Sequence, residues 1–373
     1  MYSYLVAGIF LAAIYIPFVG SISIKDSIKS QAEKRTLTPL PETPESMKAL
    51  RRYSKKYNLY YQDNFGFREH LLWYKDLKYL IGDSTSDKVI LGKDGWLFFN
   101  GEPFTDLQNA FRGLRKLKDS ELKQYADLLS AKNQWLASKG IRYLFVIAPN
   151  KHSIYSEHLP ETMFKIDNQT ITDQLVIYLQ EHSQVPILDL RQPLLEQKTM
   201  GRELYYKTDT HWNHFGSNIA QYEIAKKLSS FFPGQIKPIL YSEGDFSTSN
   251  GPGGDLAVML GFNTKFVETY PNPKIDHCAK RPRPKDGNYQ STFTTRCNKS
   301  DLEAIIFRDS FFEYLYQYIS LYFRQSTFIS KRMQNSDMEY ISAEMPDVVI
   351  EEWAERYLTV IPQSNEQFYA AAK

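Results

Sequence analysis

Residues 142–149 read RYLFVIAP, a short apolar run that ends at a proline. Consecutive apolar residues over this length are typical of a strand buried on both faces of a sheet. The residues before the run have apolar side chains at helical spacing, and Gly140 ends that pattern: Leu122, Tyr125, Leu128, Leu129, Trp135 and Leu136. The stretch therefore predicts a helix followed directly by a buried strand.

The same alternation continues along the chain. A helical pattern over about 170–182 precedes VPILDL (185–190), and a third helix is expected to start near Asn213 and stop at Pro233. Further strand-length runs are EAIIF (303–307), STFIS (326–330) and PDVVIE (346–351), with an aromatic helix at 311–323. The pattern predicts an α/β fold, a three-layer α/β/α sandwich with a mainly parallel sheet, whose sites form at the carboxyl ends of strands.

Two segments depart from this alternation. KVILGKDGWLFF (88–99) has two apolar runs around Gly-Lys-Asp-Gly, which predicts a hairpin. Residues from about 234 to 300 are rich in glycine and proline, and we expect them to form a long loop rather than an element of the core.

The N-terminus carries an uncharged, mostly apolar run, YLVAGIFLAAIYIPFVGSIS (4–23), of the length that a bilayer requires. Residues 1–24 are expected to be a membrane anchor or a signal segment, and we favour an uncleaved N-terminal transmembrane helix because neither a basic leading region nor a cleavage site is clear. The polar, proline-bearing residues 25–60 predict a linker, and residues 61–373 the folded domain. Basic residues follow the span and none precedes it, which taken alone predicts a cytoplasmic domain.

Composition narrows the functional classes. The net charge of +2 and the absence of a lysine and arginine stripe argue against nucleic acid as a partner. Cys278 and Cys297 lie in one polar loop and could form a disulfide only in an oxidising compartment, which points away from the cytoplasm. The compartment therefore has to be decided by function.

Ser310 follows the predicted strand 303–307 and opens a helical pattern, in the stretch IIFRDSFFEYL. A serine there can present its hydroxyl at the sheet edge, with its backbone N–H placed to stabilise an oxyanion. The alternative is that Asp309 or Ser310 only caps the helix. The strand context alone does not separate a nucleophile from a cap.

YYKTDTHWNHFG (205–216) supplies the groups that a nucleophilic serine needs, a general base and a carboxylate to orient it. Asp209 and His211 are two residues apart, so both side chains project to the same side of an extended or turning backbone. A metal site formed by Asp209, His211 and His214 is the alternative, but zinc would need a further ligand. We expect no metal, and we expect Asn213 and His214 to begin a helix.

KTDTHWNHFG followed later by FRDSFF resembles the SGNH-hydrolase-like domain of alginate O-acetyltransferases of the AlgX and AlgJ type. The resemblance covers roughly residues 60–360, including GKDGWLFF (92–99) and VIAPNKHSIYSEHLP (146–160). Its motif order is permuted, because the Asp-x-His pair precedes the serine. By position, the resemblance implies that Ser310 is the nucleophile, His211 the general base and Asp209 its orienting carboxylate.

The sequence departs from the pattern of SGNH enzymes at two points. Arg308 stands where a glycine is expected before Asp-Ser, and it could bind an anionic group. The glycine and asparagine that complete an oxyanion hole in ordinary SGNH enzymes have only positional candidates, Gly254 and Asn150, and either could be a turn residue instead.

The resemblance implies acetyl transfer through a seryl ester onto hydroxyls of an extracytoplasmic polysaccharide, with no cofactor. It also implies that a membrane-bound O-acyltransferase supplies the acetyl group and that the domain is periplasmic, anchored in the inner membrane. An acetylesterase of the same fold, and a non-catalytic glycan-binding component of a polysaccharide assembly complex, are the alternatives.

Overall fold

The computed structural model describes residues 4–8, 10–12, 15, 29–30, 35–44, 46–64, 76–101, 106–262, 264–275, 278 and 292–362. The chain divides into two compact units, Met1–Thr85 and Ser86–Lys373. The candidate site belongs to the second unit.

The first unit contains a short antiparallel pair, β1 (Lys29–Ser30) and β2 (Arg35–Thr36), and the helix α2 (Met47–Asn64). Helix α2 occupies part of the segment predicted as a linker. Most of the predicted anchor, including residues 16–23, lies outside the described residues. Within the described part of the chain, no helix combines the length and the apolar character needed to cross a bilayer.

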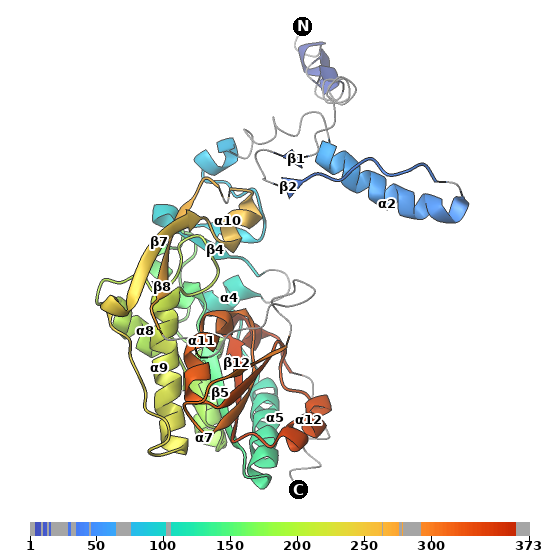
Figure 1. Cartoon of the computed structure of the whole chain (residues 1–373). Helices are drawn as coiled ribbons and strands as arrows, with labels where there is room; N and C mark the ends of the chain where they lie inside the picture. Colours follow the sequence, from blue (N-terminus) through green and yellow to red (C-terminus); the bar gives the residue numbers. More distant parts are fainter. Residues whose placement is uncertain are drawn as a thin grey trace. The chain divides into compact units, whose positions relative to one another are not determined.

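The second unit is built on a six-stranded sheet in the order β6-β5-β12-β10-β11-β9 (Figure 1). Neighbouring strands from β6 through β11 are parallel, and β9 pairs with β11 in the antiparallel direction. The strands are β5 (Arg142–Ala148), β6 (Ile187–Asp189), β9 (Phe293–Arg296), β10 (Glu303–Phe307), β11 (Gln325–Ile329) and β12 (Val348–Ala354).

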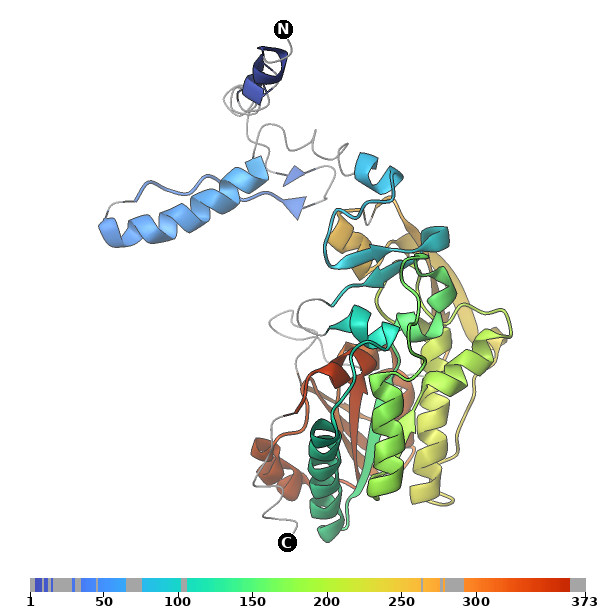
Figure 2. The same cartoon turned by 180° about the vertical axis from the view of Figure 1, so that it is seen from behind.

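Each face of the sheet carries its own hydrophobic core, because successive side chains of a strand point to opposite faces. In β5, Leu144 and Val146 belong to one core, and Phe145 and Ile147 to the other. The first core includes α8 (Arg191–Lys198), α9 (His214–Phe231) and α11 (Tyr316–Ile319); the second includes α5 (Asp119–Ser138), α7 (Ile171–His182) and α12 (Met338–Glu344). Figure 2 shows α5 and α7 in front of the strands, seen from behind.

The expected α/β/α layering is therefore present. The prediction of a mainly parallel sheet is corrected, because the sheet is mixed. The cause is β9, which lies inside the segment expected to be loop and enters the sheet antiparallel at its edge. The same segment also forms a hairpin, β7 (Phe246–Pro252) with β8 (Val267–Pro273), around the helix α10 (Asp255–Leu260). The prediction that residues 234–300 contribute no element to the core was wrong.

The remaining elements flank the sheet. The hairpin predicted at 88–99 is present as β3 (Val89–Leu91) paired with β4 (Leu97–Phe99). Two short helices, α4 (Leu107–Arg112) and α6 (Lys151–Ile154), precede α5 and follow β5, respectively. The parallel strands β5, β10 and β12 all end at one edge of the sheet, and that edge carries the residues described next.

Candidate active site

Ser310 lies three residues beyond the end of β10, at the first position of a 3-10 helix, Ser310–Tyr314. Asp309 fixes this turn, because its carboxylate accepts the N–H of Phe311 at 2.8 Å and the N–H of Ala354 at 2.7 Å. Asp309 thus caps the helix, which was one of the two alternatives predicted. Ser310 is partly exposed at the strand end. The capping alternative is confirmed for Asp309, and a nucleophilic role of Ser310 stays a prediction.

His211 lies on a tight turn whose base is the bridge between Tyr205 and Trp212. The N–H of Tyr206 donates to the carbonyl of His211 across this turn. The buried indole of Trp212 donates its Nε1–H to the carbonyl of Phe311 at 3.0 Å. This bond ties the Asp-Thr-His-Trp turn to the residue that follows Ser310.

The three predicted side chains form one hydrogen-bonded line. The Nε2 of His211 lies 2.8 Å from the Oγ of Ser310, and its Nδ1 lies 2.7 Å from Oδ1 of Asp209. If Nδ1–H donates to Asp209, Nε2 presents a lone pair to the serine hydroxyl. The imidazole also packs edge-on against the ring of Phe311, with the centroids 4.9 Å apart.

Asp209 is held as an anion. Burial favours the neutral acid, but the hydrogen bonds from His211 and from the N–H of Asp255 outweigh burial and bring the pKa of Asp209 down to about 2. Its Oδ1 accepts the backbone N–H of His211 at 3.0 Å, and its Oδ2 accepts the N–H of Asp255 at 3.0 Å. A carboxylate fixed in this way can orient the imidazole and stabilise its protonated form.

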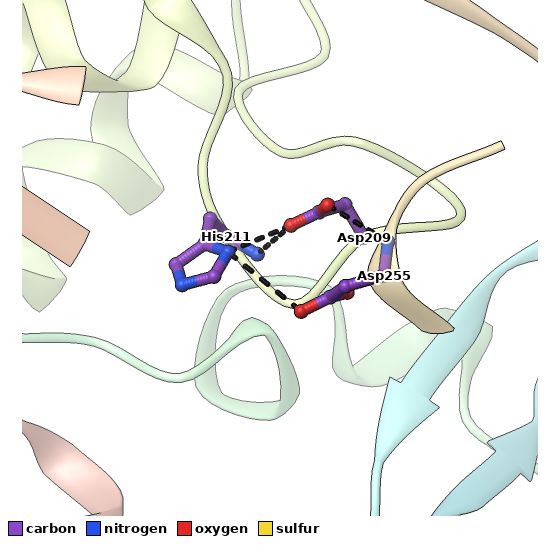
Figure 3. A group of neighbouring side chains, drawn as sticks. All are labelled: Asp209, His211 and Asp255. Atoms are coloured by element: carbon purple, nitrogen blue, oxygen red, sulfur yellow. Dashed lines mark hydrogen bonds and ion pairs between the residues drawn. The ribbon is translucent and has the colours of Figure 1, made fainter. Parts of the chain in front are cut away.

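A second carboxylate, Asp255, is directed at the same edge of the imidazole as Asp209 (Figure 3). Its Oδ2 is 3.9 Å from Nδ1 of His211, and its Oδ1 accepts the N–H of Thr210 at 2.7 Å. Burial, and then the negative charge of Asp209, raise the pKa of Asp255. Asp255 escaped the sequence predictions although it directly follows Gly254, because the surrounding segment was expected to be loop.

Two further buried charged residues support the same turn. The ammonium of Lys151 donates to the carbonyls of Leu97 and Lys207, and burial lowers the pKa of Lys151 to about 7 against the opposing effect of Asp209, Asp255 and Glu268. Glu268 on β8 accepts the N–H of Thr208 at 2.8 Å and also its hydroxyl. Sequence reasoning missed both residues: Lys151 lies in the stretch 146–160, where only Asn150 was singled out, and Glu268 lies in the segment expected to be loop.

A cavity of about 270 Å³ opens beside Ser310 and is lined by residues at and beyond the ends of β10, β11 and β12. The guanidinium of Arg332 lies 4.0 Å from the ring centre of Trp353 in this cavity. Arg308 also lines it, and its guanidinium contacts the carboxylate of Glu313 at 3.1 Å. A small ligand can therefore reach Ser310 beside cationic and aromatic groups.

Of the other predicted site residues, Arg308 and Gly254 lie close to the hydrogen-bonded line and Asn150 lies apart from it. Asn150 lines a different, much smaller cavity together with His152 and Glu355, and its N–H donates to Glu355 at 2.9 Å. Gly254 lies directly against Asp209, where a Cβ would come within 2.4 Å of the aspartate Cβ. Gly254 thus packs closely beneath the turn that carries Asp209 and His211. An oxyanion role for Asn150, Gly254 or Arg308 stays a prediction.

His214 takes the place predicted for it. It is the first residue of α9, and the side chain of Asn213 accepts the N–H groups of Phe215 and Gly216 as an N-cap. His214 contacts Gln317 rather than Asp209. Among the described residues, Asp209, His211 and Asp255 are close enough together to share a cation. However, Nδ1 of His211 and Oδ1 of Asp209 are at hydrogen-bonding distance from each other. That contact suits proton transfer and orientation.

The two cysteines are joined. Cys278 and Cys297 form a disulfide, with Cα atoms 5.2 Å apart, and Cys297 follows β9 directly. The bond therefore ties Cys278 to the end of the edge strand β9.

Comparison with known sequences gives matches over the region just described. A family model for the SGNH hydrolase-like domain of the acetyltransferase AlgX matches residues 89–299, more than half of the chain. The matched region contains Asp209, His211 and Asp255, and Ser310 follows it.

Curated relatives match at low identity. The probable alginate O-acetylase AlgJ of Pseudomonas fluorescens is 26% identical over 227 residues, which is 59% of this chain and 53% of that protein. The protein of the same name from Pseudomonas syringae pv. tomato is 25% identical over 237 residues, 62% of this chain and 56% of that protein. The chain thus spans about half the length of the curated relatives it matches.

Among solved structures, Bacillus cereus PatB1 with a sulfonyl adduct has a similar fold. The TM-score is 0.53, the sequence identity is 14%, and the alignment covers 74% of this chain and all of that chain. PatB1 without the adduct gives a TM-score of 0.50 at 16% identity. At this identity the likeness concerns the fold alone.

Proposed function

The chain belongs to the family of SGNH-hydrolase-like acetyltransferase domains represented by AlgX, and on that premise we propose that it is a serine-dependent O-acetyltransferase acting on a polysaccharide. The observation that carries the proposal is the line of two hydrogen bonds, 2.7 Å from Asp209 to His211 and 2.8 Å from His211 to Ser310. This line contains the nucleophile, base and orienting carboxylate of acyl transfer.

In the first half-reaction, the Oγ of Ser310 attacks the carbonyl carbon of an acetyl ester and its proton passes to Nε2 of His211. Asp209 stabilises the resulting imidazolium through Nδ1. The tetrahedral intermediate then collapses, the bond to the donor oxygen breaks, and the imidazolium returns the proton to that oxygen. The products are the seryl ester and the deacetylated donor.

In the second half-reaction, a hydroxyl of the acceptor gives its proton to Nε2 and attacks the acetyl group on Ser310. The bond to Oγ breaks, and Oγ recovers the proton. We place the acceptor in the cavity beside Ser310, because Ser310 lines it together with aromatic and cationic side chains. The same sequence with water as acceptor would make the protein an acetylesterase.

We further propose that the acceptor is an extracytoplasmic polysaccharide and that a membrane-bound O-acyltransferase supplies the acetyl group. The names of the curated relatives, probable alginate O-acetylases, support a polysaccharide acceptor. The Cys278–Cys297 disulfide supports an oxidising compartment such as the periplasm, against the basic residues that follow the proposed N-terminal anchor.

The test supplies the full-length protein with a chromogenic acetate ester and a polyuronate oligosaccharide, and follows ester cleavage and acetylated oligosaccharide. We expect Ser310→Ala and His211→Ala to lower kcat/KM by about a thousandfold or more, because the triad acts as a unit. His214→Ala is the matched control and keeps the wild-type rate, since its side chain contacts Gln317 and lies outside the line.

Two results would count against the proposal. Full activity of Ser310→Ala would exclude the serine mechanism. Acetate release that is unaffected by the oligosaccharide, with no acetylated product, would assign the protein to the esterases.

A further inference from the structure

The acidic partner of the catalytic imidazole is not a single residue in this protein. Both Asp209 and Asp255 place a carboxylate oxygen within 4 Å of Nδ1 of His211, at 2.7 Å and 3.9 Å respectively. The two come from separate parts of the chain, Asp209 from the turn before α9 and Asp255 from the first position of α10. Figure 3 shows both carboxylates directed at the same edge of the ring.

The backbone links the two aspartates reciprocally. The N–H of Asp255 donates to Oδ2 of Asp209, while Oδ1 of Asp255 accepts the N–H of Thr210, the residue between Asp209 and His211. The N–H groups of Leu256 and Ala257 also donate to the carbonyl of Thr208. The start of α10 therefore clamps the backbone on both sides of Asp209.

We propose that Asp255 is a positioning residue with an electrostatic role: it holds Asp209 against His211 and adds a second negative charge that stabilises the imidazolium formed during acyl transfer. The effect of Asp255 on acyl transfer rests on the proposed function. The charge effect itself requires only that His211 be protonated, because an anion about 4 Å away favours the cationic ring.

The charges around Asp255 are consistent with this role. Asp209 and His211 face it from the turn, and Lys151 faces it from α6. Tyr270 and Tyr314 also interact with its charge, and burial raises the pKa of each phenol, so both stay neutral. The carboxylates of Asp209 and Asp255 therefore both face Nδ1 of His211, and their negative charges favour the protonated ring.

A purely structural role would use only the hydrogen bonds of Asp255, and substitution separates the two roles. Asp255→Asn keeps a side-chain oxygen for the N–H of Thr210 and keeps its own N–H for Asp209, but removes the charge. Asp255→Ser also removes the charge and leaves a hydroxyl acceptor, so it provides a second uncharged variant if the first fails to fold.

The primary measurement is the NMR titration of the His211 ring in the full-length protein carrying Ser310→Ala, with and without Asp255→Asn. The signal is assigned among the seven histidines by its loss in His211→Gln. We expect the midpoint of protonation to move to lower pH by about one unit when the charge is removed. This readout needs no turnover, so it holds or fails independently of the acetyltransferase proposal.

The kinetic measurement is the pH dependence of kcat/KM for acetate ester cleavage in the Ser310 protein. We expect Asp255→Asn to move the acid limb to lower pH and to lower the plateau of kcat/KM about tenfold. Glu268→Gln is the matched control, because Glu268 also anchors the turn, through Thr208, but is not in contact with the ring. Its acid limb is expected to stay at the wild-type position.

An unchanged His211 midpoint in both folded uncharged variants would overturn the electrostatic role of Asp255. An equal shift in Glu268→Gln would also overturn it, because the effect would then belong to the turn as a whole. A shifted midpoint in a protein that transfers no acetyl group would uphold the charge effect while removing the proposed function.

Discussion

His152 is a buried imidazole on the strand-end side of β5 that plays no part in the line to Ser310. Its side chain packs between the rings of Phe98 and Phe111, with centroids 5.1 Å and 6.0 Å away, and it is 2% exposed. Burial, helped by the charges of Lys151 and Arg356, lowers the pKa of His152 to about 3. The folded protein therefore keeps this ring neutral over the usual pH range.

This residue makes stability depend on pH. The unfolded chain protonates His152 below a pH of about 6.5, whereas the folded chain does so only near pH 3, so the unfolded state binds more protons between these values. The free energy of unfolding must then fall as the pH falls through that window. From pH 6.5 to 5 the contribution of His152 is about 2 kcal/mol.

We predict that His152→Met, which removes the titrating group at similar volume, reduces the loss of stability on going from pH 7 to pH 5 by about 2 kcal/mol. Chemical denaturation at both pH values measures this difference. His182→Met is the control, because His182 is about half exposed on α7. If wild type and His152→Met lose the same amount, burial does not suppress the protonation of His152.

At the scale of elements, α10 supports the turn that carries Asp209 and His211. Gly254 precedes it, and a Cβ at this position would lie 2.4 Å from Cβ and 2.6 Å from Oδ2 of Asp209. The contact is with a short, hydrogen-bonded side chain and its backbone, which cannot move without changing the Asp209–His211 bond. Close approach of α10 therefore requires glycine here.

We predict that Gly254→Ala lowers kcat/KM about a hundredfold, because displacing a catalytic group by about 1 Å has that effect. Steady-state kinetics with an acetate ester measure the loss. Gly244→Ala is the matched control, since its nearest neighbour would be the Ser242 side chain at 3.9 Å. Equal values of kcat/KM in wild type and Gly254→Ala would contradict this, because they would show that α10 can shift to accommodate the Cβ without displacing Asp209.

The elements of the sheet were largely predictable from sequence, for a physical reason. A strand buried on both faces has to be a continuous apolar run, and the runs at 142–149 and 303–307 coincide with β5 and β10. Strand β9 could not be found in this way, because it is a four-residue edge strand, FTTR, of mixed polarity. The expected aromatic helix at 311–323 is broken into a 3-10 helix, α11 and a further 3-10 turn, although most of its buried side chains join one core.

The candidate site was predictable only where residues form a local motif. Asp209 and His211 are two residues apart, which predicts that their side chains meet. Ser310 follows a predicted strand, which predicts an exposed hydroxyl at the sheet edge. Asp255 and Glu268 contact the turn from a helix and a hairpin that are distant in sequence. Hydrophobic periodicity predicts helices and strands, but it does not predict contacts of this kind. Their partners are set by tertiary structure.

At the scale of the whole molecule, the sheet brings together residues that are about a hundred positions apart in the chain. The turn before α9 and the end of β10 meet through the Trp212 bond to Phe311 and the His211 bond to Ser310. The fold thus serves one chemical purpose in our account, the activation of Ser310 as a carrier of an acetyl group.

The most direct test of this account is to trap that carrier. The full-length protein is mixed with an acetate ester, quenched in acid within the first turnover, digested and examined by peptide mass spectrometry. We predict an acetyl group on Ser310 in the wild type and none on that peptide in Ser310→Ala, and we predict that an added acceptor glycan depletes it. Turnover without acetylation of Ser310, or acetylation of another residue that is consumed at the rate of turnover, would contradict the seryl-ester mechanism.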